Sequence, residues 1–256
     1  MTRIAVQIHP QHADYRQIRD TVLRVEEMGV DVVYNWDHFY PLYGGGTDDN
    51  VGKHFECWTM LGAWAEQTER IQFGALVTCN SYRNPNLLAD MARTVDNISG
   101  GRLILGIGSG WFEKDYDEYG YDFGTAVSRL HDLRAALPII KDRLGKLDPP
   151  PTRDIPILIG GGGEKITLRL VAEYADAWHA FGGLEVFAHK SKVLDNWCEK
   201  RGRDPGTILR SVGVGAESVD RGDEYVALGA GEITIGITGP DLDLSPVEKW
   251  IAWRDS

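Results

Sequence analysis

Short apolar runs alternate with longer amphipathic stretches along almost the whole chain. The apolar runs predict buried strands, and the stretches between them, with apolar residues three or four positions apart, predict helices. The predicted strands are Ile4–Ile8, Val32–Tyr34, Ile71–Val77, Leu103–Ile107, Ile157–Ile159, Ala177–Ala180, Leu209–Val214 and Glu232–Ile237. The predicted helices are Tyr15–Met28, Glu56–Gln67, Asn86–Ile98, Ser128–Leu144, Glu164–Tyr174, Val186–Lys200 and Pro246–Trp253.

This alternation is typical of parallel β/α units. Eight units favour a closed (β/α)8 TIM barrel over an open doubly wound sheet, which more often has five or six strands. The length of 256 residues agrees, since such barrels typically take about 250 residues. The connection from Glu217 to Gly231 is too short for a full helix, so the seventh unit is expected to be shortened. The pattern shows no linker, and we expect one α/β domain over residues 1–256.

In such a barrel the active site lies where the strands end, in the loops that follow them. The strand bodies here are apolar, whereas polar, aromatic and glycine residues follow them. A cofactor site would explain this segregation. The residues that follow the predicted strands are therefore the candidates for the site. They are His9, Asp37, His38, Thr78, Cys79, Asn80, Gly108, Ser109, Gly110, Trp111, Glu113 and Trp178.

The fifth predicted strand runs directly into four glycines and a lysine, with a predicted helix behind them. Glycines let the backbone approach a ligand closely, and the N-terminus of a helix favours an anion. We therefore predict a phosphate site formed by Gly160, Gly161, Gly162, Gly163, Glu164 and Lys165. The alternative is an ordinary tight turn between strand and helix.

Asp37 and His38 are the first candidates for proton transfer. Histidine titrates near neutral pH, and an adjacent carboxylate can orient it. Asp37 could instead cap the local loop through backbone N–H groups. Glu113 is a further candidate acid, although residues 113–118 also fit a charged, solvated segment. Trp111 and Trp178 fit either a ring-binding wall or the core.

Charge and composition argue against several classes of binding partner. The net charge is −11, from 27 basic and 38 acidic side chains, which argues against nucleic acid as a partner. The three cysteines show no metal or disulfide spacing, so we expect a reducing cytoplasm and no metal site. No long apolar run or signal peptide is visible, which predicts a soluble protein that does not enter a membrane.

These motifs together resemble the luciferase-like flavin and deazaflavin oxidoreductases, in particular the branch that uses coenzyme F420. The similarity extends almost from end to end, and its most specific parts are Trp36–Phe39, Leu76–Pro85, Gly101–Trp111, Gly160–Lys165 and Tyr174–Trp178. The resemblance implies a (β/α)8 barrel that binds the ring at its C-terminal mouth, often as a homodimer. It places Asp37 and His38 near the ring and the phosphate at Gly160–Lys165. Residues 78–80 would lie beneath the ring, near a bulge of the third strand that contains a non-prolyl cis peptide.

The resemblance thus implies an oxidoreductase that moves a hydride between F420 and a small organic substrate. The alternatives are an FMN-dependent monooxygenase of the same family and a cofactor-binding protein without turnover. Two departures argue against sugar-phosphate dehydrogenation: Leu42 stands where such enzymes have a tryptophan, and Trp111 where they have a glutamate acid, which Glu113 would replace. We expect loops 39–52 and 111–125 to select the substrate.

Overall fold

The computed structural model describes residues 1–43 and 50–256, and the described residues form nine strands that pair in parallel. The strands are β1 (Arg3–Ile8), β2 (Val32–Asn35), β3 (Gln72–Ala75), β4 (Thr78–Cys79), β5 (Leu103–Gly108), β6 (Ile157–Gly160), β7 (Ala177–Ala180), β8 (Leu209–Val214) and β9 (Glu232–Ile237). Six residues of the predicted substrate loop 39–52, residues 44–49, lie outside the described part of the chain.

The sheet closes on itself. β1 pairs with β2 on one side and with β9 on the other, and pairing continues around to β5. β3 and β4 both pair with β5, through Phe73 with Leu103 and through Thr78 with Ile107, so these two strands share one position in the barrel. The nine strands therefore fill eight positions, and the predicted (β/α)8 barrel is confirmed.

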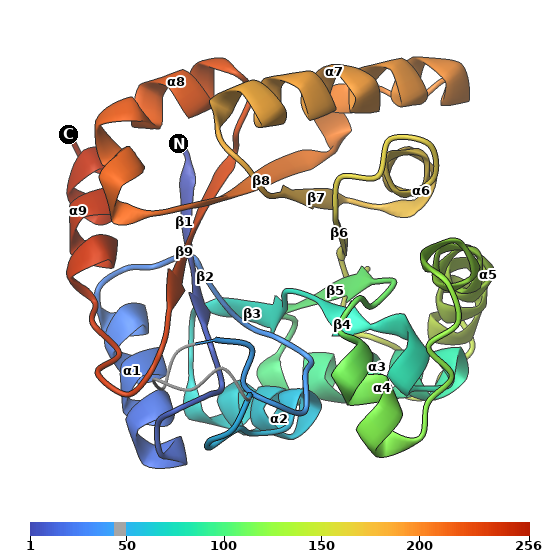
Figure 1. The fold of residues 1–256 in the computed structure, drawn as a ribbon, viewed down its shortest axis with the longest axis horizontal. Helices are drawn as coiled ribbons and strands as arrows, with labels where there is room; N and C mark the ends of the chain where they lie inside the picture. The colour runs from blue at the N-terminus through green and yellow to red at the C-terminus, as the bar shows by residue number, and fades with distance from the viewer. Residues whose placement is uncertain (44–49) are drawn as a thin grey trace.

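The helices form a ring around the strands (Figure 1). They are α1 (Tyr15–Glu27), α2 (Cys57–Gln67), α3 (Pro85–Ser99), α4 (Glu113–Tyr119), α5 (Ala126–Leu144), α6 (Thr167–Tyr174), α7 (Leu184–Arg201), α8 (Gly222–Ala227) and α9 (Ser245–Arg254), with 3-10 turns η1 (Asn80–Tyr82), η2 (Pro205–Thr207) and η3 (Ala216–Arg221). Between β8 and β9 there are only η3 and the six-residue α8, which confirms the shortened seventh unit.

Two local predictions were wrong. The third strand, predicted as one run over Ile71–Val77, is split into β3 and β4, because the chain bulges at the cis peptide between Leu76 and Val77. The helix predicted from Glu164 begins only at Thr167. The charged residues 113–118 lie in α4, where Glu113, Asp117 and Glu118 are exposed, as the solvated alternative predicts, while Asp115 and Tyr116 are buried.

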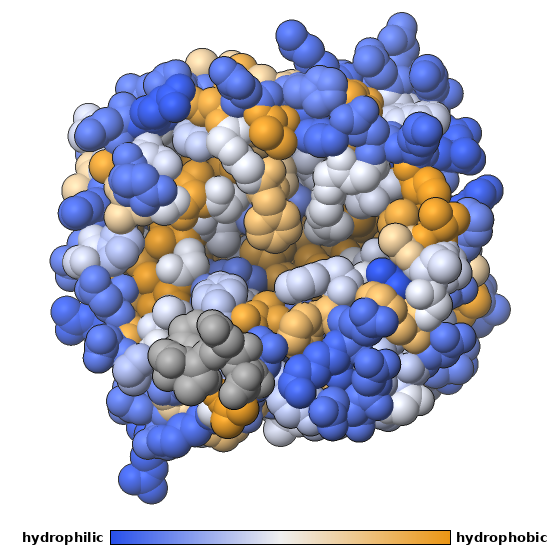
Figure 2. Space-filling view, in the orientation of Figure 1, coloured by the Kyte–Doolittle hydropathy of each residue, from blue (hydrophilic) through white to orange (hydrophobic). Residues whose placement is uncertain are grey.

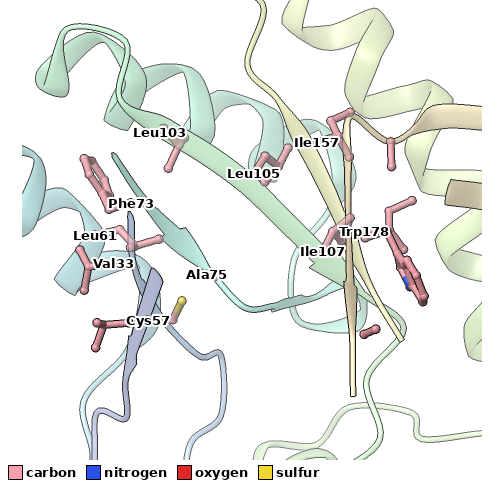
Figure 3. Close-up of a cluster of buried hydrophobic side chains, with 14 of the residues drawn as sticks. Val33, Cys57, Leu61, Phe73, Ala75, Leu103, Leu105, Ile107, Ile157 and Trp178 are labelled. Carbon is pink, nitrogen blue, oxygen red and sulfur yellow. The ribbon is translucent and has the colours of Figure 1, made fainter. Parts of the chain in front are cut away.

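The larger hydrophobic core lies between the strands and the helices, where side chains such as Phe73, Leu105 and Trp178 point outward from the barrel (Figure 3). The barrel interior holds a smaller cluster, formed by Ala5, Val32, Tyr34, Leu76, Ile104, Leu158 and Ala177. Strand residues alternate between these two sides because successive side chains of a strand point to opposite faces.

Within the described residues, no helix is both long and apolar enough to cross a membrane.

Candidate cofactor and active site

A cavity of about 400 Å³ lies at the end of the barrel where the strands finish. This volume falls within the range of small-molecule sites. The space-filling view shows a hollow over the centre of the barrel, with apolar and intermediate residues inside it and polar residues over much of the surrounding surface (Figure 2). The cavity is lined by Gln7, Trp36, Asp37, His38, Leu42, Tyr43, Leu76, Val77, Cys79, Tyr82, Gly108, Ser109, Gly110, Trp111, Gly160, Gly161, His179 and Phe181.

The floor of the cavity is made by Val77, and glycines of β5 and β6 make room for it. A Cβ added to Gly108 would lie 2.7 Å from a methyl of Val77, and one added to Gly160 would lie 3.0 Å from the other methyl. Side chains at these two positions would therefore collide with Val77. The bulge after β3 and the two glycines thus place an apolar side chain, that of Val77, in the wall of the cavity.

His38 is oriented by Asp115, not by Asp37. His38 Nδ1 lies 2.7 Å from Asp115 Oδ2, and the aspartate side chain is fully buried. Asp115 also accepts hydrogen bonds from the backbone N–H of Phe39 at 3.0 Å and from the Tyr82 hydroxyl at 3.0 Å. Among the described residues, no hydrogen bond uses His38 Nε2. Since His38 lines the cavity, this nitrogen is free to bond a ligand.

Asp37 has a structural role, because both of its carboxylate oxygens accept hydrogen bonds from other residues of the chain. Arg83 bonds Asp37 Oδ2 at 2.5 Å and Oδ1 at 3.1 Å, and the backbone N–H of Cys79 donates to Oδ2 at 3.0 Å. Arg83 also bonds Glu56, which caps α2. Burial raises the pKa of Asp37, and the Arg83 guanidinium opposes that rise. Asp37 thus ties the ends of β2 and β4 to α2, which agrees with the loop-capping alternative.

Aromatic rings surround the same side of the cavity. His9 stacks on Trp36 with ring centres 4.2 Å apart, and the Tyr43 hydroxyl lies 3.1 Å from His9 Nδ1. Trp36 donates from its indole nitrogen to His54 Nε2 at 3.0 Å. Burial lowers the pKa of His9 to about 3 and that of His54 to about 4. His9 thus lies one layer behind the cavity wall and supports Trp36 and Tyr43.

A second histidine, His179 of β7, lines the cavity from the opposite side of the barrel. It is 1% exposed, and burial lowers its pKa to about 3. Its Nδ1 lies 2.8 Å from the Ser211 hydroxyl, which in turn lies 3.0 Å from that of Thr234. This chain of hydroxyls holds the ring of a neutral imidazole in one orientation.

The glycine turn, residues 160–165, presents a concave backbone beside the cavity. Gly161 has a φ of +114°, and its carbonyl accepts from the Trp178 indole at 2.8 Å. Among the described residues, no hydrogen bond uses the backbone N–H of Gly162 or Gly163. These two donors suit an anion. The α6 helix begins at Thr167, directly behind the turn.

The positive charge beside this turn comes from α7. Lys190 Nζ lies 2.6 Å from Glu164 Oε1, and a Cβ added to Gly162 would be 3.6 Å from Lys190 Cε. His189 Nε2 lies 2.9 Å from the same oxygen of Glu164. Lys165, the predicted phosphate partner, is exposed and does not line the cavity.

The structure brings about half of the sequence-predicted site residues to the cavity. Asp37, His38, Cys79, Gly108, Ser109, Gly110, Trp111, Gly160 and Gly161 line it. Trp178 does not, because its side chain is fully buried and points to the helix side of β7 (Figure 3). There its ring stacks on that of Phe187. Thr78 points to the Trp58 indole, 3.1 Å away. Asn80 is buried outside the lining, and Glu113 is exposed at the start of α4.

Sequence reasoning missed Asp115, Lys190, Tyr43, Phe181 and the role of His179. Asp115 stands among charged neighbours, and only a helical period over residues 113–119 marks it as the buried one. Lys190 lies 26 residues after Glu164 in the sequence, and no local pattern connects it with the glycine turn. Phe181 follows β7 directly and Tyr43 lies in the loop after β2, so the rule that selected other strand ends could have found them.

Comparison with known proteins shows to which family and relatives the chain is similar. A sequence model described as luciferase-like monooxygenase matches residues 1–225. A phthiodiolone/phenolphthiodiolone dimycocerosates ketoreductase of Mycobacterium sp. (strain JLS) is 34% identical over 235 residues, 77% of this chain and 61% of the relative. An F420-dependent glucose-6-phosphate dehydrogenase of Amycolatopsis mediterranei (strain U-32) is 27% identical over 194 residues, 68% of this chain and 55% of the relative. The chain thus spans between about half and two thirds of the length of these relatives.

The fold has a similar counterpart among solved structures. An F420-dependent secondary alcohol dehydrogenase in complex with an F420–acetone adduct has a TM-score of 0.84, with 15% sequence identity. The match covers 99% of this chain and 97% of that one, so the two barrels share their arrangement of strands and helices throughout.

Proposed function

The chain belongs to the luciferase-like monooxygenase family, and on that basis we propose that it is an oxidoreductase that uses coenzyme F420. It would move a hydride between this deazaflavin and a small organic substrate. The relatives named as an F420-dependent dehydrogenase and as a ketoreductase support a reaction of this class. The family further supports the proposal that the working form is a homodimer.

The single observation that carries the proposal is the position of His38. Its Nδ1 is bound to a fully buried carboxylate, and the ring faces a cavity with an apolar floor. A histidine held in this way can take a proton at Nε2 and return it, since the carboxylate stabilises the imidazolium and fixes the tautomer. Redox chemistry between an alcohol and a carbonyl needs one such group at the oxygen.

The residues around the cavity fit a deazaflavin. Val77, packed against Gly108 and Gly160, would provide an apolar surface for the ring, because side chains at these two glycines would displace it. The N–H groups of Gly162 and Gly163, with Lys190 next to them, would hold the phosphate. When bound, the deazaflavin would supply the carbon that accepts or donates the hydride.

The chain's own residues then handle the proton. As an alcohol becomes a carbonyl, His38 Nε2 accepts the hydroxyl proton, and in the reverse direction it returns the proton to the carbonyl oxygen. Asp115 carries no proton in this scheme; it orients the imidazole and stabilises its charged form, while Tyr82 and the Phe39 N–H hold the carboxylate. The rings of Trp36, Trp111 and Phe112 lie around His38 and would flank a substrate bound there.

An FMN-dependent monooxygenase is the second candidate, because the matching family model bears that description and FMN also presents a phosphate. Spectra of the purified protein titrated with F420 and with FMN test the choice. We expect F420 to bind, to be reduced when an alcohol is oxidised to its carbonyl compound, and to be oxidised again by a ketone, without oxygen consumption. Oxygen consumption with reduced FMN would favour the monooxygenase, and tight binding of F420 without turnover on any alcohol or ketone would favour a cofactor-binding protein.

A further inference from the structure

Three large aromatic side chains at the outer edge of the cavity are exposed to solvent. Tyr43 is 52% exposed, and Trp111 and Phe181 are each 63% exposed. They follow β2, β5 and β7 respectively, so three separate loops bring them together, and all three line the cavity. We call these three residues the aromatic rim. Exposed apolar groups that gather around one cavity mark a ligand-binding surface, whereas scattered ones do not.

Aromatic rings also surround the proton-handling group, and Trp111 of the aromatic rim is one of them. The centres of the Trp36 and Trp111 rings each lie 5.8 Å from that of His38, and the Phe112 ring lies 5.6 Å away. A substrate oxygen at His38 Nε2 is therefore flanked by aromatic surfaces, and the atoms beyond it continue along the rim. Such surroundings stabilise apolar groups by removing them from water.

Among the described residues that line the cavity there is no lysine or arginine. Arg83 is bound to Asp37 and Glu56, and Arg129 donates to the carbonyls of Gly110 and Phe123. A substrate phosphate in this part of the cavity would lose its hydration without gaining a charged partner, and such desolvation is costly.

We propose that the substrate is a neutral alcohol or carbonyl compound whose reacting carbon carries an apolar chain or ring, and that Trp111 and Phe181 select it. This inference rests on the proposed function, because it names the substrate class of the same cavity. The oxygen of the substrate bonds His38 Nε2, and its apolar part leaves the cavity along the aromatic rim.

Ligand-observed NMR titration of the F420-loaded protein with 2-butanone, 2-hexanone and 2-octanone tests the inference. We expect the Kd to fall by about threefold to fourfold for each added methylene that the rim covers. Trp111→Ala and Phe181→Ala should each flatten this dependence on chain length. Val127→Ala, at an exposed position of α5 outside the cavity, is the matched control and should keep the wild-type dependence.

Two charged probes complete the experiment. Glucose 6-phosphate and a trimethylammonium alcohol should both bind more weakly than 2-octanone. A Kd independent of chain length, the same dependence in both rim variants, or tighter binding of either charged probe would overturn the inference. F420 binding, followed by its absorbance, is measured first and tests the proposed function separately. If F420 does not bind, the same ketone series on the cofactor-free protein still decides whether the cavity selects apolar substrates.

Discussion

At the scale of single residues, the pair formed by His38 and Asp115 is the feature with the clearest chemical consequence. Replacing His38 with alanine should lower kcat by about 10²–10⁴-fold, the usual contribution of a general acid or base. Cofactor affinity should change little, because the imidazole is not part of the floor or of the glycine turn. Steady-state rates and cofactor titrations of the same preparation measure the two effects, and added imidazole should restore part of the rate. An equal loss of rate and of folding stability would instead indicate a structural role.

Asp115 is a positioning residue, which acts through His38. Asp115→Asn removes the carboxylate that orients His38 and stabilises its charged form, so kcat should fall while cofactor affinity changes little. Steady-state rates and F420 titrations of the variant against wild type measure the two effects. A loss of cofactor affinity or of folding stability as large as the loss of rate would mean that Asp115 acts only through packing.

The buried histidines make stability depend on pH. His179 and His9 have pKa values of about 3 in the folded chain, because burial disfavours the charged form, whereas an unfolded histidine titrates near 6.5. Between these values the unfolded state binds more protons, so the free energy of unfolding falls as pH drops from 6.5 toward 3. Each group contributes up to about 1.4 kcal/mol per pH unit in this window.

Urea unfolding at pH 6.5, 5.5 and 4.5 measures how much one residue, His179, contributes to the pH dependence of stability. His179→Asn should make the loss of stability with falling pH shallower than in wild type, since one neutral buried imidazole is gone. His131→Asn, at an exposed position, serves as the control and should keep the wild-type slope. Identical slopes in wild type and in His179→Asn would contradict the expectation.

At the scale of elements, the contact between β3 and β5 shows how closely the strands approach. A Cβ added to Gly106 would lie 1.9 Å from the carbonyl oxygen of Ala75, a backbone atom that moves only with its strand. Gly106→Ala should therefore lower the free energy of unfolding by about 1–3 kcal/mol or more. Chemical denaturation measures this value.

A methyl group added to a glycine of α2 is expected to have the opposite effect on the free energy of unfolding. Gly62 lies within α2, and a Cβ there would have nothing within 4 Å. Gly62→Ala should raise the free energy of unfolding by about 0.5–1 kcal/mol, because alanine loses less backbone freedom than glycine in a helix. If both variants moved stability in the same direction, the close approach at Gly106 would not be the cause.

The connection between the glycine turn and α7 predicts which lysine holds the phosphate. Lys190→Ala should weaken cofactor binding by about 1.5–3 kcal/mol, the usual value for a hydrogen bond to a charged group. Lys165→Ala should have less effect, because Lys165 is exposed to solvent, whereas the Lys190 side chain lies against Gly162. Glu164→Gln should strengthen binding, since it releases Lys190 from its carboxylate partner. Fluorescence titration of F420 compares the three variants, and a larger loss for Lys165→Ala than for Lys190→Ala would favour the assignment made from the sequence.

At the scale of the whole molecule, the net charge of −11 bears on the choice of cofactor. An anionic cofactor must be held against this charge by local groups. We expect F420, whose oligoglutamate tail extends beyond the phosphate toward basic groups of α6 and α7, to bind at least about tenfold tighter than FMN, or about 1.4 kcal/mol. Because exposed charge pairs are screened, the difference should shrink with rising salt. Calorimetric titration with both cofactors at two salt concentrations measures it, and equal or tighter FMN binding would support the monooxygenase.

Local patterns in the sequence were sufficient for the barrel and for most of its strands and helices, although they did not predict α4 or the split of the third strand. The period of apolar residues reports which side of an element is buried, and the length of each connection reports whether a helix fits between two strands. The rule that barrel sites form at strand ends then selected His38, Cys79, Gly108–Trp111 and Gly160–Gly161, all of which line the cavity. The shortened seventh unit followed from the length of the connection between the last two strands.

Only the tertiary structure decided which of these residues act together. Asp115 meets His38 across 77 residues, and Lys190 meets the glycine turn from α7, because closure of the barrel brings separate loops to one end. The side on which Trp178 lies depends on the register of β7, which places it against Phe187 and leaves the neighbouring His179 facing the cavity. Sequence periodicity describes each element by itself. The partner of a side chain depends on how distant elements are packed, and that is set by the closed sheet and the helices around it.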